Sequence, residues 1–420
     1  MELRDSAQLG IPRTGIRGAL SLLSRNPDFR NLYLAQLISY AGDWFLTVAL
    51  FGLVQDLTDS PLMASLVLVF QMVPFFLASP LGGALADRMN RQRLMVVADL
   101  IRTPLCFGFL LVNGREDVWL IFVLQAVLSF FGALFDPAST AAVPNLVDEE
   151  DLPTANVLVG SAWGTMLAIG AALGGLVAAA FGRDATYIGD AASFALSAAL
   201  LSTIRRAFSE ARDDDKHIGV AEATVETIQY ARRDHRVLAL LTVKGGFGFA
   251  GGVITLLAVF AHEVFHEGDV GIGVLMAARG LGALIGPFIG RAIAGNTDRR
   301  LFVAIGLALS SFGVFYAAFG FMPALLAAAP LTTAAHLGGG AQWTLSTYGL
   351  QKLVPDRIRG RVFAFDFALV TFSITVSNLI AGWAAEQWGP RAAMVGLSVV
   401  AMTYSAVWWF GTRRIRATLE

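Results

Sequence analysis

Long apolar runs, each bounded by charged residues or by proline and glycine, alternate with short polar segments along the whole chain. A helix of about 20 apolar residues crosses the hydrocarbon core of a bilayer. The runs do not alternate apolar and polar positions, as the strands of a membrane barrel would. The pattern predicts twelve membrane-spanning helices, over residues 30–55, 62–83, 94–112, 117–138, 156–181, 185–204, 237–262, 269–291, 301–322, 323–347, 361–385 and 391–411.

The composition agrees with a lipid environment. Of the 420 residues, 55% are hydrophobic and 15% are charged, whereas a soluble domain carries about 25% charged residues. Too little polar surface exists to face water, which excludes a disordered chain and most soluble enzymes. The net charge of -1 predicts no nucleic-acid partner, and the single cysteine, Cys106, excludes an intrachain disulfide and a multi-thiolate metal site. We therefore expect an all-α membrane protein.

The basic residues are distributed unevenly between the two sides of the predicted membrane. Most of the 31 Lys and Arg fall in loops that share a side with the N-terminus, and the opposite loops contain only Arg115, Arg183 and Arg391. Cytoplasmic loops of membrane proteins are enriched in Lys and Arg. The sequence thus predicts a multi-pass protein of the inner (plasma) membrane with both termini in the cytoplasm.

One long polar interruption divides the spans into two sets of six. At a nearly constant offset, Pro80-Leu81-Gly82-Gly83 aligns with Pro287-Phe288-Ile289-Gly290, and Arg93-Leu94 aligns with Arg300-Leu301. Such a duplication is typical of secondary transporters, whose halves rock against each other. The predicted organisation is a cytoplasmic segment over 1–28, a six-helix bundle over 29–204, a cytoplasmic central loop over 205–236 with a surface helix at 220–233, a second bundle over 237–412 and a cytoplasmic tail over 413–420.

A loop motif lies between the second and third spans, where residues 83–93 read GALADRMNRQR. This segment resembles the loop signature of the major facilitator superfamily, which reads Gly, three residues, Asp, Arg or Lys, any residue, Gly, Arg, then Arg or Lys. Asn90 replaces the motif's glycine, and we expect this to be tolerated because Asn enters left-handed backbone conformations readily. Gln92 replaces the usual basic residue. The second half keeps a degraded copy in Gly290, Asp298, Arg299 and Arg300.

Further segments resemble one group within that superfamily. The segment RNPDFR at 25–30, Gly42-Asp43-Trp44 in the first span and Phe135-Asp136-Pro137 at the end of the fourth are similar to bacterial exporters that include macrolide efflux proteins and enterobactin exporters. The segment GAALGG at 170–175 is similar to an antiporter motif, with Ala171 in place of its proline. The resemblance implies two pseudo-symmetric six-helix bundles and export of small molecules.

The same resemblance implies a gate at the cytoplasmic side. Asp87 would sit against the start of the eleventh span, near Arg359 and Arg361, while Arg91 would face Asp136. The alternative is that the basic loop residues only set the topology. The implied gate residues are Gly83, Asp87, Arg88, Arg91, Asp136, Arg359 and Arg361.

Charges inside the spans indicate where coupling chemistry lies, because each ionised side chain at mid-helix costs about 2.5–3.5 kcal/mol on insertion scales. We expect Asp43 to carry a proton in competition with substrate; the alternative is a permanent ion pair with Arg102. Asp99 lies three residues before Arg102, so these two are expected to pair. Arg279 is expected to face the substrate cavity or, alternatively, to pair across the bundle interface.

Other charged residues are expected to have lesser roles. Lys244, Asp190 and Asp366 lie nearer helix ends, where snorkelling or local water lowers the cost. The pairs His262-Glu263 and His266-Glu267 look superficially like metal ligands, but no further His or Cys lies near them. No phosphate-binding loop occurs in the chain, so we expect no cofactor and an ion gradient as the energy source.

The sequence thus predicts a transporter rather than an enzyme. It would export small amphipathic molecules by alternating access, by proton antiport, as a monomer among membrane lipids. The alternatives are a lysophospholipid transporter, a facilitated-uptake permease, or a polytopic membrane enzyme or sensor. The last would need a catalytic constellation in a loop, and the segment 205–236 contains none that we recognise.

Overall fold

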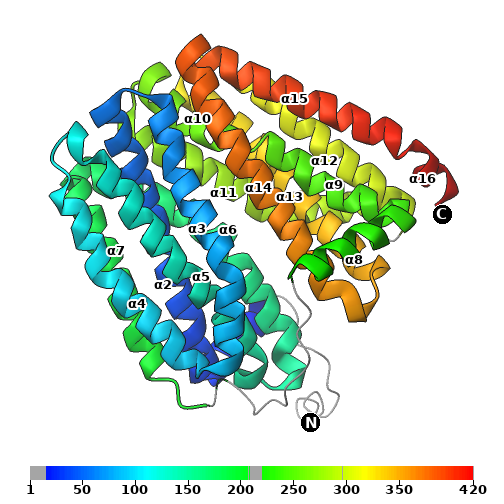
Figure 1. Cartoon of the computed structure of the whole chain (residues 1–420), viewed down its shortest axis with the longest axis horizontal. Coiled ribbons are helices and arrows are strands. Elements are labelled where there is room, and N and C mark those ends of the chain that lie inside the picture. Colours follow the sequence, from blue (N-terminus) through cyan, green and yellow to red (C-terminus); the bar gives the residue numbers. More distant parts are fainter. Residues whose placement is uncertain (1–15, 207, 209–219, 296, 420) are drawn as a thin grey trace, which may run out of the picture.

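The computed structural model describes residues 16–206, 208, 220–295 and 297–419. Within these ranges the chain forms helices and no strand. Helices α2–α7 gather into one bundle and α9–α15 into a second, and the two lie side by side (Figure 1). The predicted all-α membrane fold of two six-helix bundles is confirmed.

The first bundle contains the six expected spans in order. A short helix, α1 (Ile16–Arg25), precedes it. The spans are α2 (Pro27–Thr58), α3 (Pro61–Arg88), α4 (Arg91–Phe107) with its 3-10 extension η1 (Gly108–Leu111), α5 (Val118–Leu146), α6 (Leu152–Phe181) and α7 (Arg183–Ser202). Single 3-10 turns, η2 (Arg115–Asp117) and η3 (Glu149–Asp151), precede α5 and α6.

The second bundle begins after α8 (Val220–Arg233), which confirms that 220–233 forms a helix. Its first span is interrupted, and consists of α9 (His235–Phe249), α10 (Val253–Val259) and the π-helical turn η4 (Phe260–Val264). The other spans are α11 (Gly268–Ala294), α12 (Asp298–Phe319), α13 (Leu325–Leu353), α14 (Asp356–Trp388) and α15 (Pro390–Gly411), followed by α16 (Arg413–Thr418). Ten spans in the described part are long and apolar enough to cross a membrane, and α7 and α13 complete the twelve.

Two spans begin with the same capping device. Asn26 accepts a hydrogen bond from the Phe29 N–H at 3.0 Å, and Ser60 accepts one from the Met63 N–H at 3.2 Å. In both cases proline occupies the first turn, where no helical N–H partner exists. The RNPDFR segment is therefore a helix start.

The loop after α3 differs from the prediction at one position. Asn90 has φ -63° and ψ 112°, so the expected left-handed backbone is wrong. Its side chain instead caps α4 by accepting from the Arg93 N–H at 3.0 Å, a role for which Asn is well suited. Gln92 donates to the carbonyls of Leu201 and Ile204 at 2.8 and 2.9 Å, and so closes the end of α7.

The fourth span runs further than predicted. Helix α5 continues past Pro137 to Leu146, so Asp136 lies inside the helix and not at its end. Proline removes the helical hydrogen bond to the carbonyl four residues earlier, which belongs to Ala133. Gly82 of α3 packs directly on that carbonyl, where a methyl group would overlap it. The close approach of α3 supports the helix across the proline.

Three consecutive glycines interrupt the apolar pattern of the tenth span, yet α13 is continuous through them. Gly338 packs on the Ala308 carbonyl of α12, Gly339 on Phe247 of α9 and Gly340 on the Ala283 carbonyl of α11. Each glycine thus faces a different helix. Small residues allow membrane helices to approach closely, which explains the run.

The two bundles contact each other through α6 with α11 and through α3 with α14. Gly175 faces Gly273 and Gly280 lies on Ala168, while Gly382 lies on Ser65. These contacts fall in the halves of the helices remote from α8 and α16. We call this end, where α2 ends and α3 begins, the far side, and the opposite end the near side; the bundles converge toward α10 on the far side (Figure 1).

Candidate functional site

The Gly42-Asp43-Trp44 segment of α2 directs three consecutive residues at three helices. A methyl group at Gly42 would overlap the side chains of Asp190 and Ser193, both on α7. Asp43 forms an ion pair with Arg102 of α4. Trp44 lies under the guanidinium of Arg279 of α11, 5.6 Å from the ring centroid. One tripeptide therefore links α2 to two neighbours in its own bundle and to the second bundle.

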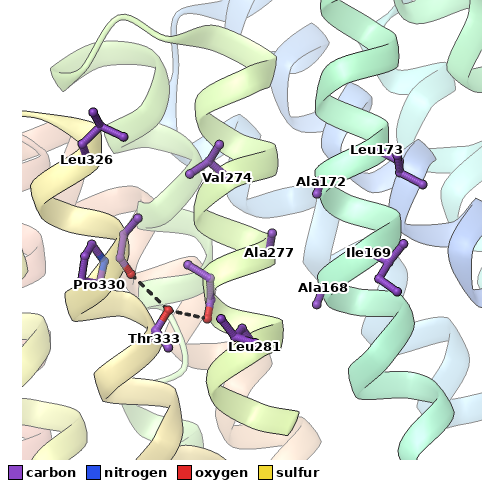
Figure 2. A pocket seen from close by; sticks show the side chains of 12 residues that line it. Ala168, Ile169, Ala172, Leu173, Val274, Ala277, Leu281, Leu326, Pro330 and Thr333 are labelled. Carbon is purple, nitrogen blue, oxygen red and sulfur yellow. Dashed lines mark hydrogen bonds between the residues drawn. The ribbon is translucent and has the colours of Figure 1, made fainter. Parts of the chain in front are cut away.

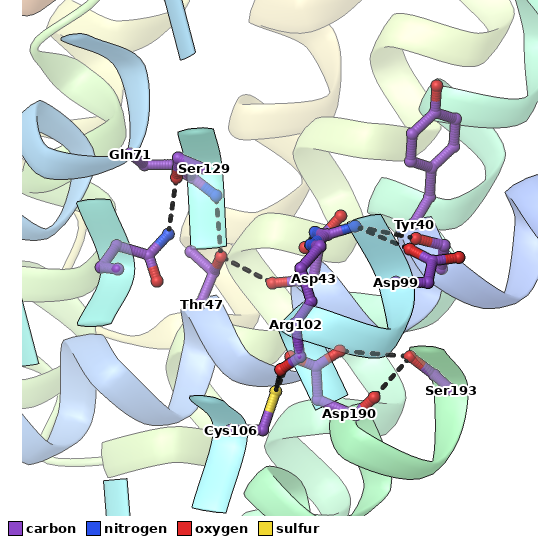
Figure 3. Close-up of polar contacts among 12 residues, drawn as sticks. Tyr40, Asp43, Thr47, Gln71, Asp99, Arg102, Cys106, Ser129, Asp190 and Ser193 are labelled. Carbon is purple, nitrogen blue, oxygen red and sulfur yellow. Dashed lines mark hydrogen bonds and ion pairs between the residues drawn. The ribbon is translucent and has the colours of Figure 1, made fainter. Parts of the chain in front are cut away.

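Arg102 of α4 contacts both Asp43 of α2 and Asp99 of its own helix (Figure 3). Its guanidinium stacks on the Phe194 ring at 3.8 Å and donates to Ser39 at 3.3 Å. Asp99 is 3.5 Å from Arg102, so the expected pair forms as a longer contact than that with Asp43, whose Oδ1 is 2.5 Å from Nη2. The Arg102 side chain is 4% exposed, whereas that of Asp43 is 32% exposed. Asp43 is thus the more accessible member of the pair.

Asp190 does not lie in the helix-end environment expected from the sequence. It is fully buried in α7 and accepts hydrogen bonds from Cys106 at 3.4 Å and from Ser193 at 3.2 Å. Cys106 is one turn from Arg102 on α4, and Ser193 lies beside Gly42. The missing side chain at Gly42 makes room for this carboxyl group, and was the signal in the sequence that could have located it.

A fourth carboxylate lies on α5. Asp136 accepts a hydrogen bond from the Tyr40 hydroxyl at 3.1 Å, and Tyr40 lies about one turn before Asp43. Arg91 donates to the carbonyls of Ala141, further along α5, and of Phe208, at 2.8 and 3.1 Å. Arg91 therefore ties the near end of α4 to α5 and to the segment after α7.

The structure describes the side chains of only some of the remaining gate residues that the resemblance implies. Gly83, Asp87, Arg88 and Arg359 lie outside the residues whose side chains the structure describes. Arg361 is partly buried near the start of α14. Their gate role therefore stays a prediction.

The second bundle contains its own intramembrane ion pair, between Lys244 of α9 and Asp366 of α14. Lys244 also donates to Thr347 at 2.9 Å and lies 4.8 Å from the Trp343 ring centroid. Both charged side chains are buried, so the expectation that they snorkel to helix ends is wrong. Mutual neutralisation, not access to water, lowers their cost in the membrane.

The interruption between α9 and α10 lies at the end of the glycine-rich segment KGGFGFAGG over 244–252. Ser377 of α14 accepts from the Gly252 N–H at 2.8 Å and donates to the Phe249 carbonyl at 2.7 Å. Thr255 donates to Asn378 at 2.7 Å. Side chains of α14 thus satisfy the backbone groups that the break exposes, as required inside a membrane, and such discontinuous spans mark binding regions in transporters.

A polar cluster joins the bundles at the far side, and sequence reasoning missed it. Arg183 of α7 contacts Asp269 of α11 through two hydrogen bonds, at 2.9 and 3.1 Å, and pairs with Asp56 of α2 at 2.6 Å. Further contacts between the bundles at this end are His262 with Asp56 at 3.5 Å, Gln55 with Glu263, and Ser60 with Glu386 at 3.2 Å. From the sequence, Arg183 is only one of the few basic residues in the loops opposite the N-terminus. The pair His262-Glu263 only looks superficially like metal ligands.

The residues that the structure describes contain no group of three or more His, Cys, Asp or Glu side chains placed to hold a metal ion. Asp43 and Lys244 each pair with an opposite charge, and Asp190 accepts from a hydroxyl and a thiol group.

Comparisons with known proteins agree with this geometry. Residues 18–416 match the transmembrane secretion effector family. The uncharacterized MFS-type transporter YfiS of Bacillus subtilis is 30% identical over 49% of this chain and 51% of its own length, so the chain aligns with about half of YfiS. The multidrug efflux pump Tap of Mycolicibacterium fortuitum is 25% identical over 88% of this chain and 91% of Tap.

Among solved structures, a bacterial homologue of the human lysosomal transporter Spinster, inward-facing and unoccupied, matches with a TM-score of 0.73 at 14% identity. The match covers 95% of this chain and 98% of that one, which shows a shared fold. The family match and the similar efflux pump confirm the prediction of a transporter rather than an enzyme. The chain belongs to the transmembrane secretion effector family of the major facilitator superfamily, and is a membrane transporter of small molecules.

Proposed function

We propose that this transporter exports small amphipathic molecules in exchange for protons, from an inner membrane in which the near side faces the cytoplasm. The similarity to an efflux pump supports the direction. The concentration of Lys and Arg in near-side loops supports the orientation, with both termini cytoplasmic.

The observation that carries the proton proposal is the excess of carboxyl groups around one guanidinium. Asp43, Asp99, Asp136 and Asp190 lie in the interior of the first bundle, and Arg102 is the cation that contacts two of them. Four carboxylates and one guanidinium leave a large net negative charge if all are ionised, which a membrane interior strongly disfavours. Protons therefore reside on part of this set, and their number can change during the cycle.

Asp43 is the group whose protonation would matter most. When its carboxylate gains a proton, the ion pair with Arg102 is lost, and Arg102 can turn on the Phe194 ring toward Asp99 and Asp190. The guanidinium keeps an anionic neighbour, so the exchange avoids an unpaired buried charge. Substrate that occupies the exposed face of Asp43 would favour release of the proton, which is the competition that antiport requires.

Movement at Asp43 has a short route to the second bundle. Trp44, the next residue, contacts Arg279 of α11 across the interface of the bundles. A rotation of α2 that follows release of Arg102 would shift this contact, while the glycines of α6 and α11 allow the helices to slide. This route links protonation to the rocking that exposes the substrate path.

The two ends of the molecule would act as alternating gates. The far-side cluster of Arg183, Asp56 and Asp269 holds that end closed in the present conformation. On the near side, the gate would comprise Asp136, the loop-motif residues Gly83, Asp87, Arg88 and Arg91, and Arg359 and Arg361 near the start of α14. We expect the contacts of one gate to break as the contacts of the other gate form.

The experiment has a binding arm and a transport arm. Purified protein is heated with ethidium, erythromycin, a catecholate siderophore or lysophosphatidylcholine, since a bound cargo raises the melting temperature by mass action. Stabilisation by a drug or siderophore supports export of amphipathic molecules, whereas stabilisation by the lysolipid alone would favour lysophospholipid transport. Uphill efflux of the stabilising compound from cells should then stop with a protonophore and with Asp43→Asn; unchanged uphill efflux in both cases would refute proton coupling.

A further inference from the structure

A membrane-level groove lies apart from the charged site, on α6, α11 and α13 (Figure 2). Its volume is about 680 Å³, and apolar side chains line it except at Thr333. The Thr333 hydroxyl lies within hydrogen-bond distance of the carbonyls of Ala278 and Ala329, at 3.1 and 3.3 Å. Its only hydroxyl is thus engaged with the protein's own backbone, so the groove fits a ligand without polar atoms at this depth.

The position of the groove determines what surrounds it. It occupies the far-side halves of the three helices, from Leu326 near the start of α13 to Leu281 and Ala168 at mid-span. Leu326 is 85% exposed, and Leu173 and Leu281 are exposed as well. In a bilayer these side chains meet hydrocarbon. Water would find no polar partners in such a groove.

The groove also bridges the two bundles. Its floor is the contact of α6 with α11, where Gly280 lies on Ala168 and Gly273 faces Gly175. Arg279, the residue before Gly280, reaches Trp44 instead. An occupant would therefore touch both bundles beside the interface that has to move, on the opposite side of α11 from the charged contact.

We propose that this groove binds one acyl chain of a bilayer phospholipid from the far-side leaflet. The volume lies in the range of small-molecule sites, about 300–1,000 Å³. Bilayer hydrocarbon is as apolar as the groove, so selection rests on close packing against alanine and leucine rather than on hydrophobic transfer. The headgroup stays at the membrane surface beyond Leu326, since the groove presents no polar group to bind it.

The test uses the full-length protein and a phosphatidylglycerol whose acyl chain contains a photoreactive diazirine. Ala172→Phe and Ala277→Phe fill the groove, and Ala195→Phe places the same side chain on an exposed position of α7 outside it. Melting temperatures without added lipid show that each variant is folded. We expect the lipid to stay bound when the detergent is exchanged before irradiation. Peptides spanning 168–173 and 274–281 should then be labelled both in the unmodified protein and in the Ala195→Phe control.

In both groove variants this labelling should fall at least about tenfold, equivalent to about 1.4 kcal/mol of binding free energy. Native mass spectrometry should show about one retained phospholipid per chain in the control and none in the groove variants. Labelling that is uniform over all membrane-facing helices, or that is equal in Ala172→Phe and Ala195→Phe, would overturn the proposal. Neither readout depends on transport, so failure here leaves the proposed export function untouched.

Discussion

Removal of the Arg183 side chain should open the far side of the transporter. Arg183→Ala deletes two hydrogen bonds to Asp269 and the ion pair with Asp56. It leaves the Asp269 carboxylate, whose side chain is 10% exposed, without its guanidinium partner. The closed conformation loses these interactions, whereas a conformation with separated bundles does not contain them.

The size of the effect follows from the burial of the pair. Truncation of one partner in a buried, hydrogen-bonded charge pair costs about 2–5 kcal/mol. Because Asp56 is 46% exposed, the lower limit applies here. A loss of about 2 kcal/mol raises the ratio of far-open to far-closed molecules roughly thirty-fold.

The assay reports that population directly. Ser65 is buried on α3 where Gly382 of α14 contacts it, so a Ser65→Cys thiol reacts with a polar maleimide only when the bundles separate. The native Cys106 is buried, and protein without the added cysteine gives the background. Labelling should be about thirty-fold faster in Arg183→Ala, provided that the open state stays the minor one.

A second arginine at the same end provides the matched control. Arg391 donates to the Gly320 carbonyl within the second bundle, at 2.8 Å. Arg391→Ala removes one positive charge from the far side but no contact between bundles, and should leave the labelling rate unchanged. Equal rates in the two variants, whether both fast or both slow, would refute the assignment of the far-side cluster as a gate.

Three further predictions concern stability. Gly42→Ala should lower it by about 1–3 kcal/mol, seen as a lower melting temperature, because the methyl overlaps the α7 side chains; an unchanged melting temperature would contradict this packing. Lys244→Met alone should destabilise by about 3–5 kcal/mol and Lys244→Met with Asp366→Leu much less, since the double change leaves no unpaired charge; equal losses would argue against a paired site. The hydrogen bonds from the Arg236 side chain lower the pKa of Asp234. The ionised Asp234 carboxylate therefore stabilises the fold at neutral pH, and this stabilisation is lost as the pH falls below about 4. The difference in stability between the unmodified protein and Asp234→Ala, about 1 kcal/mol at pH 7, should shrink at acidic pH.

The twelve helices were predictable because the signal is local. A span needs only an apolar run of sufficient length, and the predicted runs coincide with helices even where Gly338, Gly339 and Gly340 weaken the pattern. Helix ends were less predictable. Helix α5 passes Pro137 because Gly82 of another helix packs on the exposed carbonyl, and no local pattern contains that neighbour.

The charged site was predictable in part. Charges at mid-span identified Asp43, Arg102 and Arg279, since an unneeded charge there is costly. Their partners come from distant segments. Asp190 is 84 residues from Cys106, and Arg183 is 86 residues from Asp269. An expectation based on distance from a helix end misplaced Asp190, because burial depends on how α7 packs against α2 and α4.

The central claim is that Asp43 exchanges protons during export, and reconstituted protein tests it most directly. Proteoliposomes with a pH-sensitive dye inside receive a substrate gradient, with the membrane potential held at zero by potassium and valinomycin. The account predicts that substrate movement drives protons in the opposite direction in the unmodified protein, and that Asp43→Asn still allows downhill substrate movement without any proton flux. Proton movement of equal size in Asp43→Asn, or none in the unmodified protein while substrate moves, would contradict it.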